Sequence, residues 1–288
     1  MVAPNRFVLI AMLAAAVASQ AARAQDGGGL AIHHLSVAGA DFGDATIRER
    51  QSGLRGWSRE YAFDRVAFRF AATYAYTRYE FDGLDSRDRD LHSVHVPLQW
   101  RTHDGRWFVV LTPVIATSSN VFKDLVNRGT SDDYDLYARA EYRAPAGNGA
   151  IGWRAAVVRD AAFGRPQPYP EVALLWNDGR FEADVGLPRA RLDWKARDDL
   201  ALGVAVAPAG AQWHVVSDER GGAEFDFRAR AWRGGLHAAW RPWRFLRING
   251  QIGIEFARNY AFEDDAGAVV GRDAASAPYW RIDLAWDF

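Results

Sequence analysis

The last nine residues of the chain, 280–288, read WRIDLAWDF and alternate between apolar and polar side chains. The apolar positions are Trp280, Ile282, Leu284, Trp286 and Phe288. The positions between them include Arg281, Asp283 and Asp287. Because successive side chains of a β-strand point to opposite faces, this stretch predicts a strand that separates two unlike environments.

The same alternation recurs upstream, in residues 66–76, 134–142, 181–187, 224–231 and 246–256. Short turn sequences such as 103–105 and 177–179 separate some of these runs, and longer polar connections lie at 82–90, 118–131, 218–223 and 261–277. Short turns at one end and long loops at the other are typical of outer-membrane barrels. The sequence therefore predicts an all-β fold, an antiparallel up-and-down transmembrane β-barrel of about twelve strands in residues 60–288, with ten and fourteen strands also allowed.

Two stretches leave the strand count open. Leu187–Trp194 and Val206–Trp213 each read as one kinked strand or as two strands around a proline, Pro188 or Pro208. The alternation also changes phase between Ala231 and Leu236. A β-bulge at Gly234-Gly235 is expected to restore it.

The composition excludes several classes of protein. The chain has 288 residues, no cysteine and a formal net charge of −1. It therefore lacks the basic surface of a nucleic-acid binder and the thiols of a disulfide, Fe–S or Cys–zinc site. Aromatic residues make up 13% of the chain, and several stand near strand ends, as in the aromatic girdles of membrane barrels. A soluble periplasmic β-protein that binds an apolar ligand remains the alternative architecture.

Residues 1–24 are expected to be a cleaved signal peptide. Arg6 precedes the apolar run 7–17, and Ala22-Arg23-Ala24 forms an A-x-A cleavage site. The run is too short to span a bilayer, which needs about 20 residues. Residues 25–59 are Gly-rich and mixed in pattern, so they are interpreted as a separate N-terminal segment, either a periplasmic tail or a plug, with a short strand at Ile32–Val37 as a further alternative.

Charged residues that alternate with the apolar ones are expected to line the barrel interior, because an arginine on the lipid face costs about 2–4 kcal/mol. These residues are Arg65, Arg69, Arg139, Glu141, Glu182, Asp184, Glu224, Asp226, Arg228, Arg230, Arg247, Glu255, Arg281 and Asp283. Both signs are equally represented among them. This balance favours cross-strand ion pairs and argues against strong ion selectivity, which needs a ring of one sign.

The terminal strand resembles the carboxy-terminal signature of Gram-negative outer-membrane β-barrel proteins. Phe288 and Trp286 match its aromatic positions and Arg281 its polar one, whereas its preferred Gly is Asp283 here. The segments 170–176 and 185–190 are similar to an uncharacterised outer-membrane β-barrel domain family. The resemblance implies an outer-membrane location, with the barrel-assembly machinery reading the signal formed by Trp280, Ile282, Leu284, Trp286 and Phe288. Periplasmic chaperones, outer-membrane lipid and lipopolysaccharide are the expected partners.

The expected function is that of a monomeric barrel, either a narrow pore for small solutes or a structural barrel, with no cofactor and no enzymatic activity. The alternative is a lipid-directed hydrolase, for which His34-Leu35-Ser36 and His92-Ser93 supply a base and a nucleophile.

Two acidic loops could hold calcium through carboxylate oxygens, but the first is interleaved with arginines and neither has an EF-hand pattern. Their acidic residues are Asp82, Asp85, Asp88, Asp90, Glu263, Asp264, Asp265 and Asp273.

Overall fold

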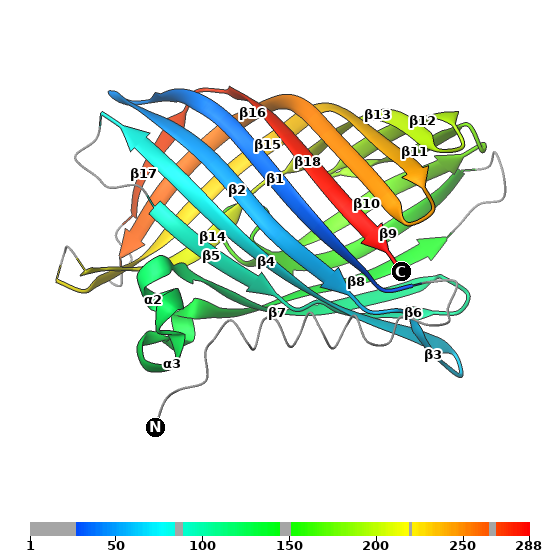
Figure 1. Ribbon diagram of the computed structural model, residues 1–288, viewed down its shortest axis with the longest axis horizontal. Coiled ribbons are helices and arrows are strands. Elements are labelled where there is room, and N and C mark those ends of the chain that lie inside the picture. The colour runs from blue at the N-terminus through cyan, green and yellow to red at the C-terminus, as the bar shows by residue number, and fades with distance from the viewer. Residues whose placement is uncertain (1–26, 84–88, 145–150, 219–220, 265–268) are drawn as a thin grey trace.

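The computed structural model describes residues 27–83, 89–144, 151–218, 221–264 and 269–288. The predicted signal peptide lies outside them. The described chain forms one antiparallel sheet closed into a barrel of 14 wall strands (Figure 1). The prediction of an all-β antiparallel barrel is therefore confirmed, and the strand count falls at the upper end of the expected range.

In chain order the elements are β1 (Gly29–Phe42), β2 (Ala45–Trp57), β3 (Tyr61–Phe63), β4 (Val66–Asp82), β5 (Arg89–His95), β6 (Leu98–Thr102), β7 (Trp107–Ser118), α2 (Ser119–Lys123), α3 (Leu125–Arg128), the 3₁₀ turn η1 (Ser131–Asp133), β8 (Tyr134–Ala144), β9 (Ile151–Asp160), β10 (Gln167–Asn177), β11 (Phe181–Leu187), β12 (Ala190–Arg197), β13 (Leu200–Pro208), β14 (Ala211–Ser217), β15 (Ala223–Trp243), β16 (Leu246–Asp264), β17 (Val269–Ala274) and β18 (Ala277–Asp287). Some of these segments run end to end along one neighbour and form a single wall strand. These pairs are β2 with β3, β5 with β6, β13 with β14, and β17 with β18.

The N-terminal segment is part of the wall, so its interpretation as a separate tail or plug is wrong. β1 pairs with β18 from Gly29↔Asp287 to Val37↔Tyr279 and thereby closes the barrel. β2 pairs with β1 on one side and β4 on the other. The alternative of a short strand at Ile32–Val37 falls within β1, whereas β2 was not predicted. The outward faces of both strands carry polar residues such as His34 and Ser52, which hide the apolar alternation.

The two prolines mark different breaks. Pro188 stands in the turn between β11 and β12, which are separate wall strands. Pro208 instead ends β13, and β14 continues along the same neighbour, β15. Pro208 therefore marks an interruption within one wall strand, where a residue without a backbone N–H can be accommodated.

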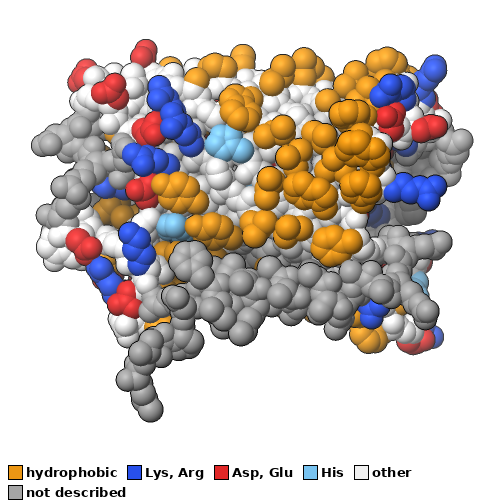
Figure 2. All heavy atoms as spheres, in the orientation of Figure 1, with side chains coloured by type: hydrophobic (Ala, Val, Ile, Leu, Met, Phe, Trp, Pro, Cys, Tyr) orange, Lys and Arg blue, Asp and Glu red, His pale blue; other side chains and the backbone are white. Residues whose placement is uncertain are grey.

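The middle of the barrel wall is apolar on the outside and polar on the inside. Ile252 and Ile254 on β16 are 60% and 55% exposed, whereas Glu255 beside them is 1% exposed. Figure 2 shows hydrophobic side chains gathered across the middle of the wall and charged side chains toward its two ends. A soluble barrel would show the reverse pattern, so the outer surface matches a protein surrounded by lipid. No helix among the described residues has the length and apolar composition needed to span a membrane.

One end of the barrel carries the start of β1 at Gly29, the end of β18 at Asp287 and the tight turns 64–65, 103–105, 198–199 and 244–245, and we call it the short-turn end. The other carries α2, α3, η1 and the longer connections, and we call it the long-loop end (Figure 1). At the long-loop end β14 pairs directly with β7 through His214↔Thr117. Elsewhere β8 to β13 stand between these two strands, so the barrel narrows toward the long-loop end.

Candidate functional site

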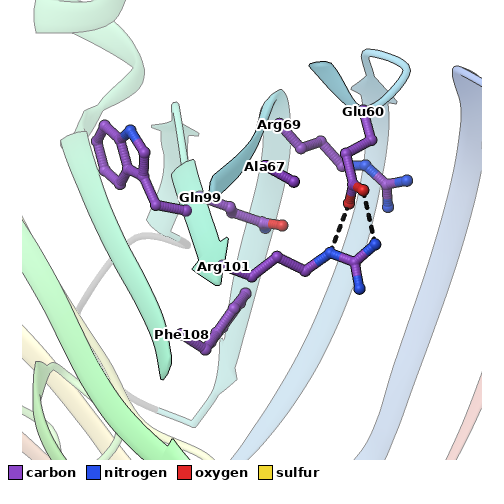
Figure 3. A pocket seen from close by; sticks show the side chains of 7 residues that line it. Glu60, Ala67, Arg69, Gln99, Arg101 and Phe108 are labelled. Carbon is purple, nitrogen blue, oxygen red and sulfur yellow. Dashed lines mark hydrogen bonds and ion pairs between the residues drawn. The ribbon is translucent and has the colours of Figure 1, made fainter. Parts of the chain in front are cut away.

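The barrel interior at the short-turn end contains a pocket of about 300 Å³. Arg69, Gln99 and Arg101 line it, together with Glu60 from the connection between β2 and β3 (Figure 3). Arg101 donates two hydrogen bonds to the Glu60 carboxylate, of 2.7 Å and 2.6 Å. These bonds hold the pKa of the Glu60 carboxyl below its ordinary value. The carboxylate therefore remains ionised at neutral pH, and the entrance is lined by fixed charges.

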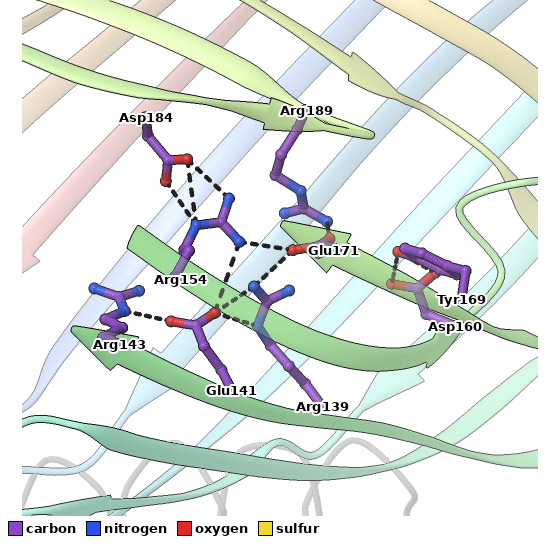
Figure 4. Close-up of polar contacts among 9 residues, drawn as sticks. All are labelled: Arg139, Glu141, Arg143, Arg154, Asp160, Tyr169, Glu171, Asp184 and Arg189. Atoms are coloured by element: carbon purple, nitrogen blue, oxygen red, sulfur yellow. Dashed lines mark hydrogen bonds and ion pairs between the residues drawn. The ribbon is translucent and has the colours of Figure 1, made fainter. Parts of the chain in front are cut away.

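Farther in, ion pairs join β8, β9 and β10 into one charged network (Figure 4). The Glu171 side chain is completely buried and accepts hydrogen bonds from Arg139 at 2.7 Å and Arg154 at 2.9 Å. Arg189, from the turn between β11 and β12, lies 2.7 Å from its second oxygen. Arg154 also reaches Asp184 on β11 at 2.9 Å. Because every carboxylate here meets at least one guanidinium, burial of these charges is compensated.

The network extends along β8 through Glu141, which is 1% exposed. Its carboxylate accepts hydrogen bonds from Arg139 and Arg143 on the same strand. Residues two apart on a strand share a face, so these arginines stand on either side of Glu141. Charged groups therefore line the wall from the pocket to the middle of the barrel.

A second ion-paired group joins β15 and β16 to β2, although β18 and β1 stand between β16 and β2 in the wall. Arg233 contacts Glu255 at 2.6 Å and Glu49 at 3.0 Å. Arg258 is fully buried, lies 3.0 Å from Glu255 and donates a 2.8 Å hydrogen bond to the Tyr260 hydroxyl. This group thus connects the charged interior to the aromatic residues nearer the long-loop end.

The interior of the long-loop end is filled by what we call the aromatic cluster. Its buried members are Phe42, Ile47, Tyr79, Phe81, Leu91, Trp213, Val215, Phe225, Phe227, Ala229 and Tyr260. The centroid of the Tyr79 ring on β4 lies 5.0 Å from the centroid of the Phe227 ring on β15 and 5.9 Å from that of the Trp213 ring on β14. These contacts join strands far apart around the wall. A polar interior therefore ends in a packed apolar layer.

The aromatic cluster corrects the predicted inward direction of four charged residues on β15. Phe225, Phe227 and Ala229 are 8%, 0% and 7% exposed and face the interior. The four charged residues that alternate with them must therefore point outward. They are Glu224, Asp226, Arg228 and Arg230. The physical reason is that this part of β15 lies beyond the apolar band, where the outer surface meets water and an apolar interior is favoured.

The predicted bulge at Gly234-Gly235 is wrong, because the odd-numbered residues of β15 face inward from Phe225 to His237 and only the residue types on the two faces change. The register of β15 against β16 shifts between Arg230 and Trp232, near Ala257, which has a φ of 51°. Gly234 and Gly235 pair regularly with Ile254 and Gly253. The extra residue of this shift therefore lies on β16, and β15 itself has no bulge between Phe227 and Arg233, which share the inward face.

The other predicted interior residues fall in two groups. Arg65 is in the turn before β4, where its side chain is 93% exposed beside Asp64. The remaining residues lie on the inward face of the wall by strand register. They are Arg69, Arg139, Glu141, Glu182, Asp184, Arg247, Glu255, Arg281 and Asp283. Sequence reasoning missed Glu49, Arg154, Glu171, Arg189, Arg233 and Arg258, although an isolated acid within the apolar run 170–176 could have pointed to Glu171.

The predicted His–Ser pairs are not formed. Ser93 is 8% exposed and faces the interior, whereas its neighbour His92 points outward. His34 contacts Ser52 at 2.8 Å rather than Ser36. Among the described residues no group of three or more His, Cys, Asp or Glu side chains could hold a metal ion. Asp85, Asp88 and Asp265 lie outside those residues, as do the side chains of Glu263 and Asp264.

Comparison with known proteins gives matches in structure alone. No protein-family model and no curated protein matches the chain. The chain resembles the COG4313 outer membrane channel from Pseudomonas putida F1, with a TM-score of 0.50 and 11% identity over 92% of this chain and 97% of that one. It also resembles the translocator domain of autotransporter NalP from Neisseria meningitidis, with a TM-score of 0.40 and 9% identity over 98% and 96% of the two chains. A third similar structure is the Pseudomonas putida toluene transporter TodX, with a TM-score of 0.39 and 10% identity over 92% and 90%. The protein has the fold of the outer-membrane β-barrel proteins.

Proposed function

We propose that this protein is an outer-membrane channel for small solutes and that the aromatic cluster closes its extracellular end. The observation that carries the proposal is the ion-paired network of the interior, which leads from the short-turn end to the aromatic cluster. A purely structural barrel has no need of charged groups along its interior from the short-turn end to its middle, because burying them is costly. The fold shared with an outer-membrane channel of Pseudomonas putida supports the same conclusion.

The direction of the barrel follows from its ends. In bacterial barrels the short turns face the periplasm and the longer loops face outward. The pocket at Glu60 and Arg101 is then the periplasmic entrance, and the aromatic cluster is the external barrier. Solutes between them would pass Arg139, Glu141, Glu255 and Asp184, where paired charges of both signs give no strong preference for cations or anions.

Residues 1–24 would direct export and be removed near Ala24. The terminal strand would then be read by the barrel-assembly machinery through Trp286 and Phe288, after transit with periplasmic chaperones. Once inserted, the apolar band would contact outer-membrane lipid and lipopolysaccharide, with the protein acting as a monomer. These assignments are supported by the resemblance of the terminal strand to the outer-membrane signature.

Liposome swelling tests the channel. We expect liposomes that contain the parent protein to swell slowly in small neutral solutes such as glycerol, and to swell much faster after Tyr79→Ala and Phe227→Ala are combined. The reason is that the two substitutions remove rings that meet across the interior. Protein-free liposomes set the baseline. If neither folded protein increases swelling above that baseline, the barrel is structural and the proposal fails.

A further inference from the structure

Three polar side chains are hydrogen-bonded in series on the outer wall. His92 on β5 places Nε2 2.7 Å from the Ser119 hydroxyl oxygen at the start of α2. Its Nδ1 lies 2.8 Å from the Tyr74 hydroxyl oxygen on β4. The Phe122 ring stacks on the imidazole, with ring centroids 4.4 Å apart and planes inclined by 5°. The histidine is thus held on both nitrogens and on one ring face.

The series faces away from the barrel interior. Leu91 and Ser93, the neighbours of His92, are 0% and 8% exposed and point inward. His92 must therefore point outward, as does Tyr76, with which it is paired in the sheet. Ser119 is half-buried, and its hydroxyl lies on the same side of the wall because it contacts the outward-pointing His92.

Along the barrel axis, the hydrogen-bonded series of Tyr74, His92 and Ser119 lies at the edge of the outer apolar band. The outward residues of β4 are apolar or aromatic from Phe68 to Tyr76 and charged at Arg78 and Glu80. His92 lies beside Tyr76, at this boundary on the long-loop side. In an outer membrane this boundary is the headgroup level of the outer leaflet, where tyrosines gather and where the ester bonds of lipids lie.

We propose that Ser119 and His92 form an esterase site for a carboxylic ester of an outer-leaflet lipid, with Tyr74 as a positioning residue. The site is separate from the interior and goes beyond the proposed channel. When Nδ1–H donates to the Tyr74 oxygen, Nε2 is left unprotonated and accepts from the Ser119 hydroxyl. A nucleophile, a base and a group that orients the base then stand in hydrogen-bond reach, which is the arrangement that acyl transfer requires.

The reaction balances with water as the only co-reactant. The Ser119 oxygen attacks the ester carbonyl carbon and its proton passes to His92 Nε2. The bond to the lipid alcohol then breaks, and the departing oxygen takes that proton from Nε2, which leaves an acyl group on Ser119. Water attacks this acyl group and gives a proton to Nε2. The Ser119 oxygen leaves with the proton, and a free carboxylic acid is released.

A second His–Ser contact on the same wall provides a matched control. His34 Nδ1 lies 2.8 Å from the Ser52 oxygen. Within the described residues no hydrogen bond engages the other nitrogen of the His34 ring, which instead lies against Trp280 with centroids 5.0 Å apart. A pair without an orienting partner is expected to be inert. Ser93 is a second control, because it adjoins His92 in sequence but faces the interior.

The test uses purified full-length barrel in detergent micelles, a fluorophosphonate probe and p-nitrophenyl butyrate. We expect the probe to modify Ser119, as shown by peptide mass spectrometry. Ser119→Ala should abolish labelling, and both Ser119→Ala and His92→Gln should lower the rate of hydrolysis by about 100-fold or more. Ser52→Ala and Ser93→Ala should match the parent. A retained heat-modifiable gel shift would show that each variant is folded.

Tyr74→Phe separates positioning from structure. Without the hydroxyl acceptor the imidazolium is less stabilised, so the acid limb of the kcat/KM profile should move to lower pH while the gel shift and liposome swelling stay unchanged. Absence of labelling at Ser119 in the folded parent, labelling of Ser52 instead, or full activity in folded His92→Gln would each overturn the proposal. Because swelling reports the channel and hydrolysis reports Ser119, failure of one leaves the other intact.

Discussion

Exchanging Glu171 for alanine is expected to lower the free energy of unfolding by about 3 kcal/mol. The Glu171 carboxylate is fully buried and lies within 2.9 Å of nitrogens from Arg139, Arg154 and Arg189. Its removal leaves three guanidinium groups facing one another, and among the described residues only Arg139 and Arg154 keep a second carboxylate partner. Urea unfolding in micelles, followed by tryptophan fluorescence, measures the loss.

Glu182→Ala is the matched control for this experiment. The same side chain is removed from β11, but at an exposed position near the short-turn end. Its unfolding free energy should differ from that of the parent by no more than about 0.5 kcal/mol. Equal losses in the two variants would show that the Glu171 network contributes no more to stability than an ordinary exposed charge.

Combining Tyr79→Ala with Phe227→Ala is expected to raise single-channel conductance in planar bilayers about tenfold, because an apolar constriction excludes water and ions until it is widened. The two rings are 2% and 0% exposed and meet at 5.0 Å between β4 and β15. The substitutions shorten side chains and leave the backbone pairing of β4 with β2 and of β15 with β16 in place. The barrel should therefore remain closed around a wider pore.

Phe256→Ala controls for the loss of an aromatic ring. Phe256 is 37% exposed on the outer face of β16, and its truncation should leave conductance at the parent value. Unchanged conductance in the folded double variant would mean that the aromatic cluster is not the barrier.

The barrel could be predicted from its regular strands, and above all from residues 280–288. There, large apolar and charged residues alternate without interruption. The same reasoning gave only a short strand at Ile32–Val37 as one alternative for β1 and missed β2, because outward residues such as His34, Ser52 and Arg50 are polar or charged. The predicted inward direction of the charged residues was also wrong for the part of β15 near the long-loop end, residues 224–230. Alternation shows that a strand has two unlike faces, but it does not show which face lies inside once the strand leaves the apolar band.

The interior network was only partly predictable. Arg139 and Glu141 stand out because they alternate with apolar residues on one strand. Glu171 and Arg189 meet only because the turn between β11 and β12 approaches β10, and no local pattern records that approach. His92 and Ser119 likewise come together only through the helix that follows β7.

The most direct test of the account asks which face of β15 is accessible from outside the cell in the part of the strand near the long-loop end, residues 224–231. The chain contains no cysteine, so single cysteines can be placed at Ala229, which is 7% exposed inside the aromatic cluster, and at the outward-facing Arg230. A membrane-impermeant maleimide added to intact cells should label Arg230→Cys rapidly and Ala229→Cys at least about tenfold more slowly, because burial within a packed layer excludes the reagent. Faster labelling of Ala229→Cys than of Arg230→Cys would contradict the account, because the aromatic face of β15 would then lie outside the barrel.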